Sequence, residues 1–142
     1  MRGDFLHNEV LVRRLSQVGQ ERGAVVRLEV PVPIDGAVNY IDLVLEKGGQ
    51  LTACEAEQWW RRVGNDVRKA NALGARRLLI VTPDSHTAQT CRRQLRRHMP
   101  SGAKLQVIVC PLGAALEILR QTLNNTPNAP AAPVPPAQTK EP

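Results

Sequence analysis

The chain has 142 residues, 42% of them hydrophobic, and a formal net charge of +6 at pH 7. This length and composition fit one globular domain with a single core, and they exclude a multidomain enzyme. The excess of positive charge favours a polyanionic partner such as nucleic acid. Since the sequence holds only two tryptophans, one tyrosine and one phenylalanine, we expect a core built from Leu, Val, Ile and Ala.

The three cysteines, Cys54, Cys91 and Cys110, are odd in number and widely spaced. This pattern argues against a disulfide framework and against a structural zinc site. We therefore expect reduced cysteines that behave as small buried residues. The sequence also lacks an apolar run of membrane-spanning length and the apolar stretch of a signal peptide, which predicts a cytoplasmic protein with no membrane partner.

Hydrophobic periodicity and glycine or proline signals divide the chain into nine elements. Helices are expected at 7–23, 59–74, 84–99 and 112–123, and strands at 24–30, 38–46, 50–57, 76–83 and 104–110. A short glycine turn joins the second and third strands into an antiparallel hairpin. The helix at 59–74 connects that hairpin to a buried strand, which implies a parallel pairing. The sequence therefore predicts an α/β fold with a mixed central sheet flanked by helices.

A change of composition marks the end of the domain. From residue 124 the chain reads NNTPNAPAAPVPPAQTKEP, where proline recurs and large apolar residues are missing. Such a segment buries too little surface to offset the entropy of ordering, so we expect disorder with polyproline II character. The predicted organisation is a domain at 1–123 and a tail at 124–142.

Acidic residues gather on the predicted hairpin. Residues two apart share a face of a strand, so Glu55 and Glu57 should point the same way. The same rule sorts the partner strand into one face with Val38, Tyr40, Asp42 and Val44 and another with Ile41, Leu43 and Leu45. The hairpin brings Asp42 close to the two glutamates. Three carboxylates at this distance must be protonated, solvated or neutralised by a cation, and Mg²⁺ or Mn²⁺ would suit these oxygen ligands.

The stretch IDLVLEKGGQLTACEAE, together with the order of helix, three strands, helix and strand, resembles the PD-(D/E)XK nuclease superfamily over residues 6–83. The resemblance implies a restriction-endonuclease-like αβββαβ core, here with an additional αβα extension. It also implies a Mg²⁺-dependent endonuclease that hydrolyses phosphodiester bonds in DNA. Asp42 and Glu55 match the two metal-binding positions, and Glu9 matches an extra metal ligand found in several branches.

The sequence departs from this family at Glu57, where most members have lysine. A few restriction endonucleases of the superfamily look similar, with glutamate at that place. We expect Glu57 to orient or deprotonate the attacking water or to bind a second ion. The segment from Gly64 to Val81 also resembles nuclease-like proteins in which an asparagine and a lysine face the site, so Asn65 and Lys69 could contact it. Lys69 would take the lysine's role, with Gln58 as a weaker candidate.

Arginines supply candidate phosphate contacts. They lie in two groups, with Arg61, Arg62 and Arg68 after the third strand and Arg92, Arg93, Arg96 and Arg97 along a predicted basic helix. Either group could instead be a solvated face. Trp59 and Trp60 directly follow the carboxylates, where they could pack in the fold or stack on a base.

Other functions stay open at this level. Loss of catalysis at Glu57 would leave a nuclease-fold module that binds DNA without cutting it. The proline-rich tail could dock a protein partner, which would make the chain an interaction scaffold. Self-association into a homodimer is a further option that the sequence leaves undecided.

Overall fold

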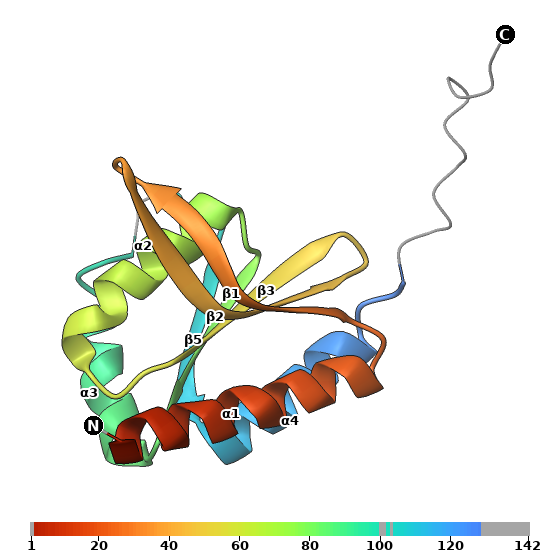
Figure 1. Ribbon diagram of the computed structural model, residues 1–142, viewed down its shortest axis with the longest axis horizontal. Helices are drawn as coiled ribbons and strands as arrows, with labels where there is room; N and C mark the ends of the chain where they lie inside the picture. Colours follow the sequence, from red (N-terminus) through yellow and green to blue (C-terminus); the bar gives the residue numbers. More distant parts are fainter. Residues whose placement is uncertain (1, 100–101, 103, 129–142) are drawn as a thin grey trace, which may run out of the picture.

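The computed structural model describes residues 2–99, 102 and 104–128 (Figure 1). The helices are α1 (Arg2–Glu21), α2 (Val63–Leu73), α3 (Ser85–Leu95) and α4 (Leu112–Asn124), with a 3₁₀ turn η1 (Trp60–Arg62) before α2. The strands are β1 (Val25–Ile34), β2 (Ala37–Lys47), β3 (Gln50–Ala56), β4 (Arg77–Thr82) and β5 (Gln106–Pro111). The predicted order of elements is confirmed.

The five strands form one mixed sheet in the order β1-β2-β3-β4-β5. The first three strands are antiparallel neighbours, whereas β3 pairs in parallel with β4 and β4 with β5. Helix α2 connects β3 to β4, and the parallel pairing predicted from that connection is confirmed. The α/β class and the mixed sheet flanked by helices are therefore correct.

Two hydrophobic clusters hold the helices against opposite faces of the sheet. Helices α1 and α4 lie side by side on one face, where Leu11, Leu15 and Leu119 are buried (Figure 1). Helices α2 and α3 cover the other face through residues such as Val67 and Ala88. Leu, Val, Ile, Ala and Cys make up both clusters, as the composition predicts. All three cysteines are free and buried, and no helix in the described part of the chain is long and apolar enough to cross a membrane.

Several element boundaries differ from the sequence prediction. Strand β1 continues through Pro31 and Pro33 to Ile34, because it is an edge strand and proline is tolerated there. The turn to β2 uses Asp35 and Gly36, both with positive φ, as a two-residue hairpin requires. Asp84 is the N-cap of helix α3, and its side chain accepts from the Thr87 amide, but the helix ends at Leu95. The predicted helix to residue 99 is therefore wrong in its last turn.

The residues that follow α4 still pack on the domain as far as Pro127. Asn124 is the last residue of α4, Thr126 is buried, and the Thr126 hydroxyl donates to the Thr122 carbonyl. The Pro127 carbonyl lies so close to Gly48 (φ 60°) that a side chain at residue 48 would collide with it. The packed chain thus extends beyond the predicted boundary at 123. The predicted disorder otherwise concerns residues 129–142, which lie outside the described residues.

The alternation of faces in β2 is interrupted at Asp42. Ile41 packs in the same cluster as Val44, whereas Leu43 packs on the opposite face, so the predicted grouping of Ile41 with Leu43 is wrong. The pairing of β1 with β2 omits the residue opposite Asp42, Glu29, which has a φ of 51°. A left-handed residue in a ladder bends the strand locally and increases its twist. Beyond the bend, Val32 of β1 and Ile41 of β2 pack in the cluster on the α2 side of the sheet.

Candidate active site

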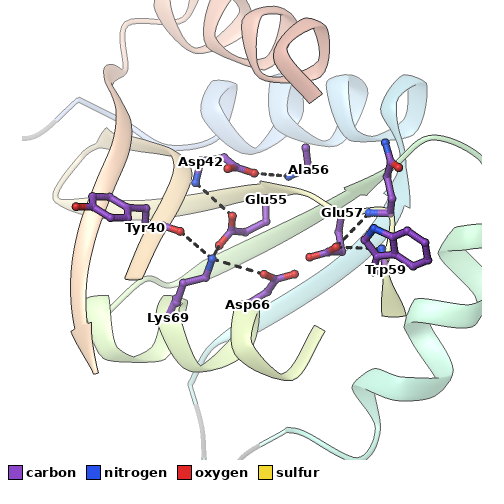
Figure 2. Close-up of polar contacts among 9 residues, drawn as sticks. Tyr40, Asp42, Glu55, Ala56, Glu57, Trp59, Asp66 and Lys69 are labelled. Carbon is purple, nitrogen blue, oxygen red and sulfur yellow. Dashed lines mark hydrogen bonds and ion pairs between the residues drawn. The ribbon is translucent and has the colours of Figure 1, made fainter. Parts of the chain in front are cut away.

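Strands β2 and β3 separate at one end of their ladder, and side chains replace the missing backbone bonds. Backbone pairing ends at Leu43 and Cys54. Beyond it, the Asp42 amide donates to Glu55 Oε1 (3.2 Å), and the Ala56 amide donates to Asp42 Oδ2 (2.9 Å; Figure 2). Each carboxylate thus satisfies a backbone donor of the other strand. The predicted proximity of Asp42 and Glu55 is confirmed.

Lys69 enters this opening from α2. Its ammonium lies 2.6 Å from Glu55 Oε2 and 3.7 Å from Asp66 Oδ1, and it donates to the Tyr40 carbonyl at 2.8 Å (Figure 2). The amphipathic pattern of α2 buries Val63, Val67 and Ala70 and leaves Lys69 facing the sheet. Lys69 therefore supplies a positive charge that the carboxylates need, and it satisfies a carbonyl that the separated strands leave free.

A second pair of acids lies beside the first. Glu57 and Asp66 are 5% and 3% exposed. Glu57 follows the last residue of β3, and its Oε2 accepts from the Gln58 amide (3.1 Å) and the Trp59 amide (3.0 Å). These bonds fix the loop that leads into η1. Glu57 is thus placed at the site as predicted, but after the strand and with one oxygen committed to its own loop.

Burial shifts the ionisation of the cluster. It raises the pKa of Glu55 to about 8, against the lowering effect of the Lys69 ammonium. Burial, together with the neighbouring carboxylates of Glu57 and Glu55, raises the pKa of Asp66 well above its usual value. Burial alone would lower the pKa of Lys69, yet its acidic neighbours raise it, with Glu55 contributing most. Protonation and the internal ammonium together make the clustered carboxylates tolerable in the fold.

The acids and Lys69 line a polar pocket of about 290 Å³. Its lining comprises Asn8, Tyr40, Asp42, Glu55, Ala56, Glu57, Arg62, Asn65, Asp66 and Lys69. Three oxygens of pocket residues, Asn8 Oδ1, Asp66 Oδ2 and Glu55 Oε2, are buried without a hydrogen-bond partner of good geometry within the described residues, although Glu55 Oε2 faces the Lys69 ammonium. Burying an oxygen without a partner costs free energy, and a bound donor or cation would remove that cost.

Among the described residues, no three His, Cys, Asp or Glu side chains lie close enough together to hold a metal ion. Mg²⁺, however, is commonly bound by one or two carboxylates and keeps several waters. Asp42 and Glu55 provide those two carboxylates, and the Asn8 amide oxygen lines the same pocket. The donor set is all oxygen, as hard divalent ions prefer. The residues present therefore fit a hydrated Mg²⁺ or Mn²⁺ ion.

Glu9 lies outside the pocket that holds Glu55. It is half-exposed on α1, 3.6 Å from Arg13, and it lines an adjoining pocket of about 340 Å³ together with Asp42 and Glu29. Its neighbour Asn8 is the α1 residue that reaches both pockets. The resemblance predicts Glu9 as a metal ligand, whereas α1 places the Asn8 amide in the pocket that holds Glu55.

The candidate phosphate-binding residues near α2 differ in what their side chains contact. Arg62 and Asn65 are exposed and line the carboxylate pocket, as predicted for residues that contact a substrate. Arg68 is instead 2.6 Å from Asp35 in the β1–β2 turn. Arg61 lies over the Trp60 ring, with its guanidinium carbon 5.4 Å from the ring centroid.

The second arginine group is not one basic helix. Arg92 donates from two nitrogens to the Val109 carbonyl of β5, at 3.1 and 2.7 Å. Arg93 is exposed on α3, while Arg96 and Arg97 follow the end of the helix. The four side chains therefore do not form one stripe that could follow a phosphate backbone, and Arg92 has a structural role.

Arg92→Ala should lower the free energy of unfolding by about 1.5–3 kcal/mol, because the buried Val109 carbonyl loses a charged donor. Arg93→Ala is the matched control: Arg93 is the next residue and is also exposed, but it makes no hydrogen bond or ion pair within the described residues, so its loss should leave stability unchanged. Urea denaturation followed by circular dichroism measures both. Equal destabilisation by the two variants would contradict the assignment.

Sequence reasoning missed Asp66, Asn8 and the Tyr40 carbonyl. Asp66 precedes Lys69 by three residues, so it shares a helix face with it, and this spacing was a usable signal. Asn8 adjoins Glu9, but only the packing of α1 shows which of the two faces the sheet. The carbonyl follows from the separation of β2 and β3, which no local pattern encodes.

Comparison with protein-family models, with curated proteins and with solved structures finds no match for this chain. The function is therefore inferred from the geometry of the pocket and from the chemistry of its residues.

Proposed function

We propose that the protein is a divalent-metal-dependent nuclease, with a restriction-endonuclease-like core, that hydrolyses phosphodiester bonds in DNA. One observation carries the proposal: Asp42 from β2, Glu55 from β3 and Lys69 from α2 meet in one polar pocket, with the lysine ammonium 2.6 Å from the glutamate. Two acids and a lysine are the groups that the resemblance to the nuclease superfamily requires. Lys69 supplies from α2 the amine that the sequence lacks at residue 57.

In this proposal Asp42 and Glu55 would hold Mg²⁺ or Mn²⁺. When bound, such an ion lowers the pKa of a coordinated water and neutralises charge that develops on the phosphate. Lys69 orients the Glu55 carboxylate and contacts the scissile phosphate. The paired amides of Ala56 and Asp42 fix both carboxylates, so little reorganisation is needed when the substrate arrives.

The rim of the pocket supports a phosphate substrate. Arg62 and Asn65 are exposed beside the carboxylates and can donate to phosphate oxygens. Glu57 has its Oε2 occupied by two backbone amides, so we assign it to positioning the loop that carries Arg62. Its other oxygen is the one that could orient a water. The formal net charge of +6 favours approach of a polyanion to the domain.

Incubation of the purified protein with supercoiled plasmid and with a four-way DNA junction, in Mg²⁺ or Mn²⁺, tests the proposal. We expect nicking or resolution that EDTA abolishes. Asp42→Asn should lower the initial rate by at least about 100-fold, because it removes a charge from the cation-binding pair.

The matched control is Glu46→Gln, which removes an acid from the same strand outside the pocket. Its ion pair with Arg27 is partly exposed and should contribute little. Equal rates for the wild type and Asp42→Asn would assign the cleavage to a contaminant. Absence of cleavage on every substrate, with DNA binding retained, would identify an inactive binding module.

A further inference from the structure

The only two tryptophans in the chain are adjacent and both exposed. Trp59 and Trp60 expose 56% and 40% of their surface, on the segment between β3 and α2. Burying an indole would stabilise the fold, because it removes a large apolar surface from water. Single exposed apolar residues need no explanation, but two neighbouring tryptophans do.

This segment is attached to the carboxylate pocket at both ends. Glu57, which lines the pocket, accepts from the Trp59 amide at 3.0 Å, and Figure 2 shows the Trp59 indole beside the Glu57 side chain. At the other end, Arg62 lines the same pocket, and its amide donates to the Trp59 carbonyl at 3.0 Å. The backbone that carries both tryptophans is therefore anchored at the proposed site of cleavage, and the Trp59 indole lies beside it.

The segment is also held in place before any ligand arrives. The two amide bonds to Glu57 and the first turn of η1 fix its backbone. A rigid platform loses little entropy when it binds. The positive charge of Arg61 over the Trp60 ring, together with Arg62 on the rim of the pocket, favours a ligand that combines negative charge with flat apolar faces.

We infer that Trp59 and Trp60 form a stacking platform for unpaired nucleobases, so that the preferred substrate is a single-stranded or locally unpaired strand. This inference rests on the proposed function, whose substrate class it specifies. Bases inside a duplex stack on one another and present only their edges, so an exposed indole can stack only on a base that has left the helix. Aromatic stacking tolerates any base sequence, so the platform selects strand structure.

Tryptophan fluorescence gives a direct test, because both indoles belong to the platform. The protein in EDTA is titrated with an oligothymidylate of about 12 nucleotides, with an abasic strand of equal length and with a blunt duplex. We expect strong quenching by oligothymidylate, and an affinity at least about tenfold higher than for the abasic strand or the duplex. Trp59→Ala and Trp60→Ala should each weaken binding of a labelled oligothymidylate by about tenfold, with no effect on the abasic strand.

Two controls separate stacking from folding. Trp59→Phe should retain most of the affinity, and Val25→Ala, which truncates an exposed apolar residue on β1, should retain all of it. An oligouridylate arm distinguishes RNA from DNA, and tight binding of either supports the platform. Equal loss of base-bearing and abasic binding, or saturation without quenching, would overturn the inference.

The same experiment tests the platform independently of the proposed nuclease activity. Because EDTA prevents metal-dependent cleavage, binding is measured apart from catalysis. Base-dependent binding without cleavage in Mg²⁺ would refute the nuclease and leave the platform standing. If both alanine variants cleaved unpaired strands at the wild-type rate, the platform would be refuted and the nuclease would stand.

Discussion

Lys69→Met should abolish phosphodiester cleavage and destabilise the fold at the same time. The substitution removes the ammonium between Glu55 and Asp66 and leaves the Tyr40 carbonyl without its donor. Removing one partner of a buried ion pair costs about 3–5 kcal/mol, because the remaining carboxylate must stay charged without a partner or take up a proton. We also expect the initial rate of plasmid nicking to fall by at least about 100-fold, because the phosphate loses its electrostatic partner.

Two variants separate the catalytic from the structural contribution. Lys69→Arg keeps the charge but spreads it over a planar group, so it should recover much of the stability and little of the rate. Lys104→Met removes an exposed lysine and should change neither quantity. The rates are compared at a temperature where circular dichroism shows every variant to be folded. A folded Lys69→Met protein that cleaves at the wild-type rate would show that Lys69 is only structural.

The fold class was predictable because local signals agreed with the global arrangement. Gly74, predicted to end α2, has a φ of 82° and caps the helix with bonds to the Ala70 and Asn71 carbonyls. Asp84 caps α3 as its position before the helix indicates. Where the prediction failed, tertiary context decided. Pro31 is compatible with a strand only because β1 lies at the edge of the sheet, which the local sequence does not reveal.

The candidate site was predictable only where it depends on strand register. Asp42 and Glu55 lie across one hairpin, and a tight turn fixes such a register. The place of Glu57 was harder to predict, because β3 ends before it and strand alternation no longer applies. Lys69 lies on a helix whose hydrophobic periodicity was predictable. The space that its side chain enters exists only because β2 and β3 separate, and this separation was not predictable. That separation coincides with the interrupted pairing at Asp42, a backbone feature without a sequence motif.

Without divalent ions, the stability of the protein should fall as the pH rises from about 5 to 8. The pKa of Glu55 is raised from 4.5 to about 8 in the folded protein, so the folded state binds more protons than the unfolded state across this range. The raised pKa of Asp66 acts in the same direction. The raised pKa of Lys69 matters only above 10.5. The loss should be on the order of 3 kcal/mol, measured by urea denaturation in EDTA.

Substitutions at the two acids identify the source of this dependence. Glu55→Gln should flatten the decline, and Asp66→Asn should remove part of the rest, whereas Glu117→Gln, on the exposed face of α4, should leave it unchanged. Mg²⁺ should restore stability more at pH 8 than at pH 5, because protons compete with the cation for the same carboxylate oxygens. EDTA should reverse the gain. If Glu55→Gln kept the wild-type decline, Glu55 would not be the titrating group. If Mg²⁺ stabilised that variant as strongly as the wild type, Glu55 would not be a ligand.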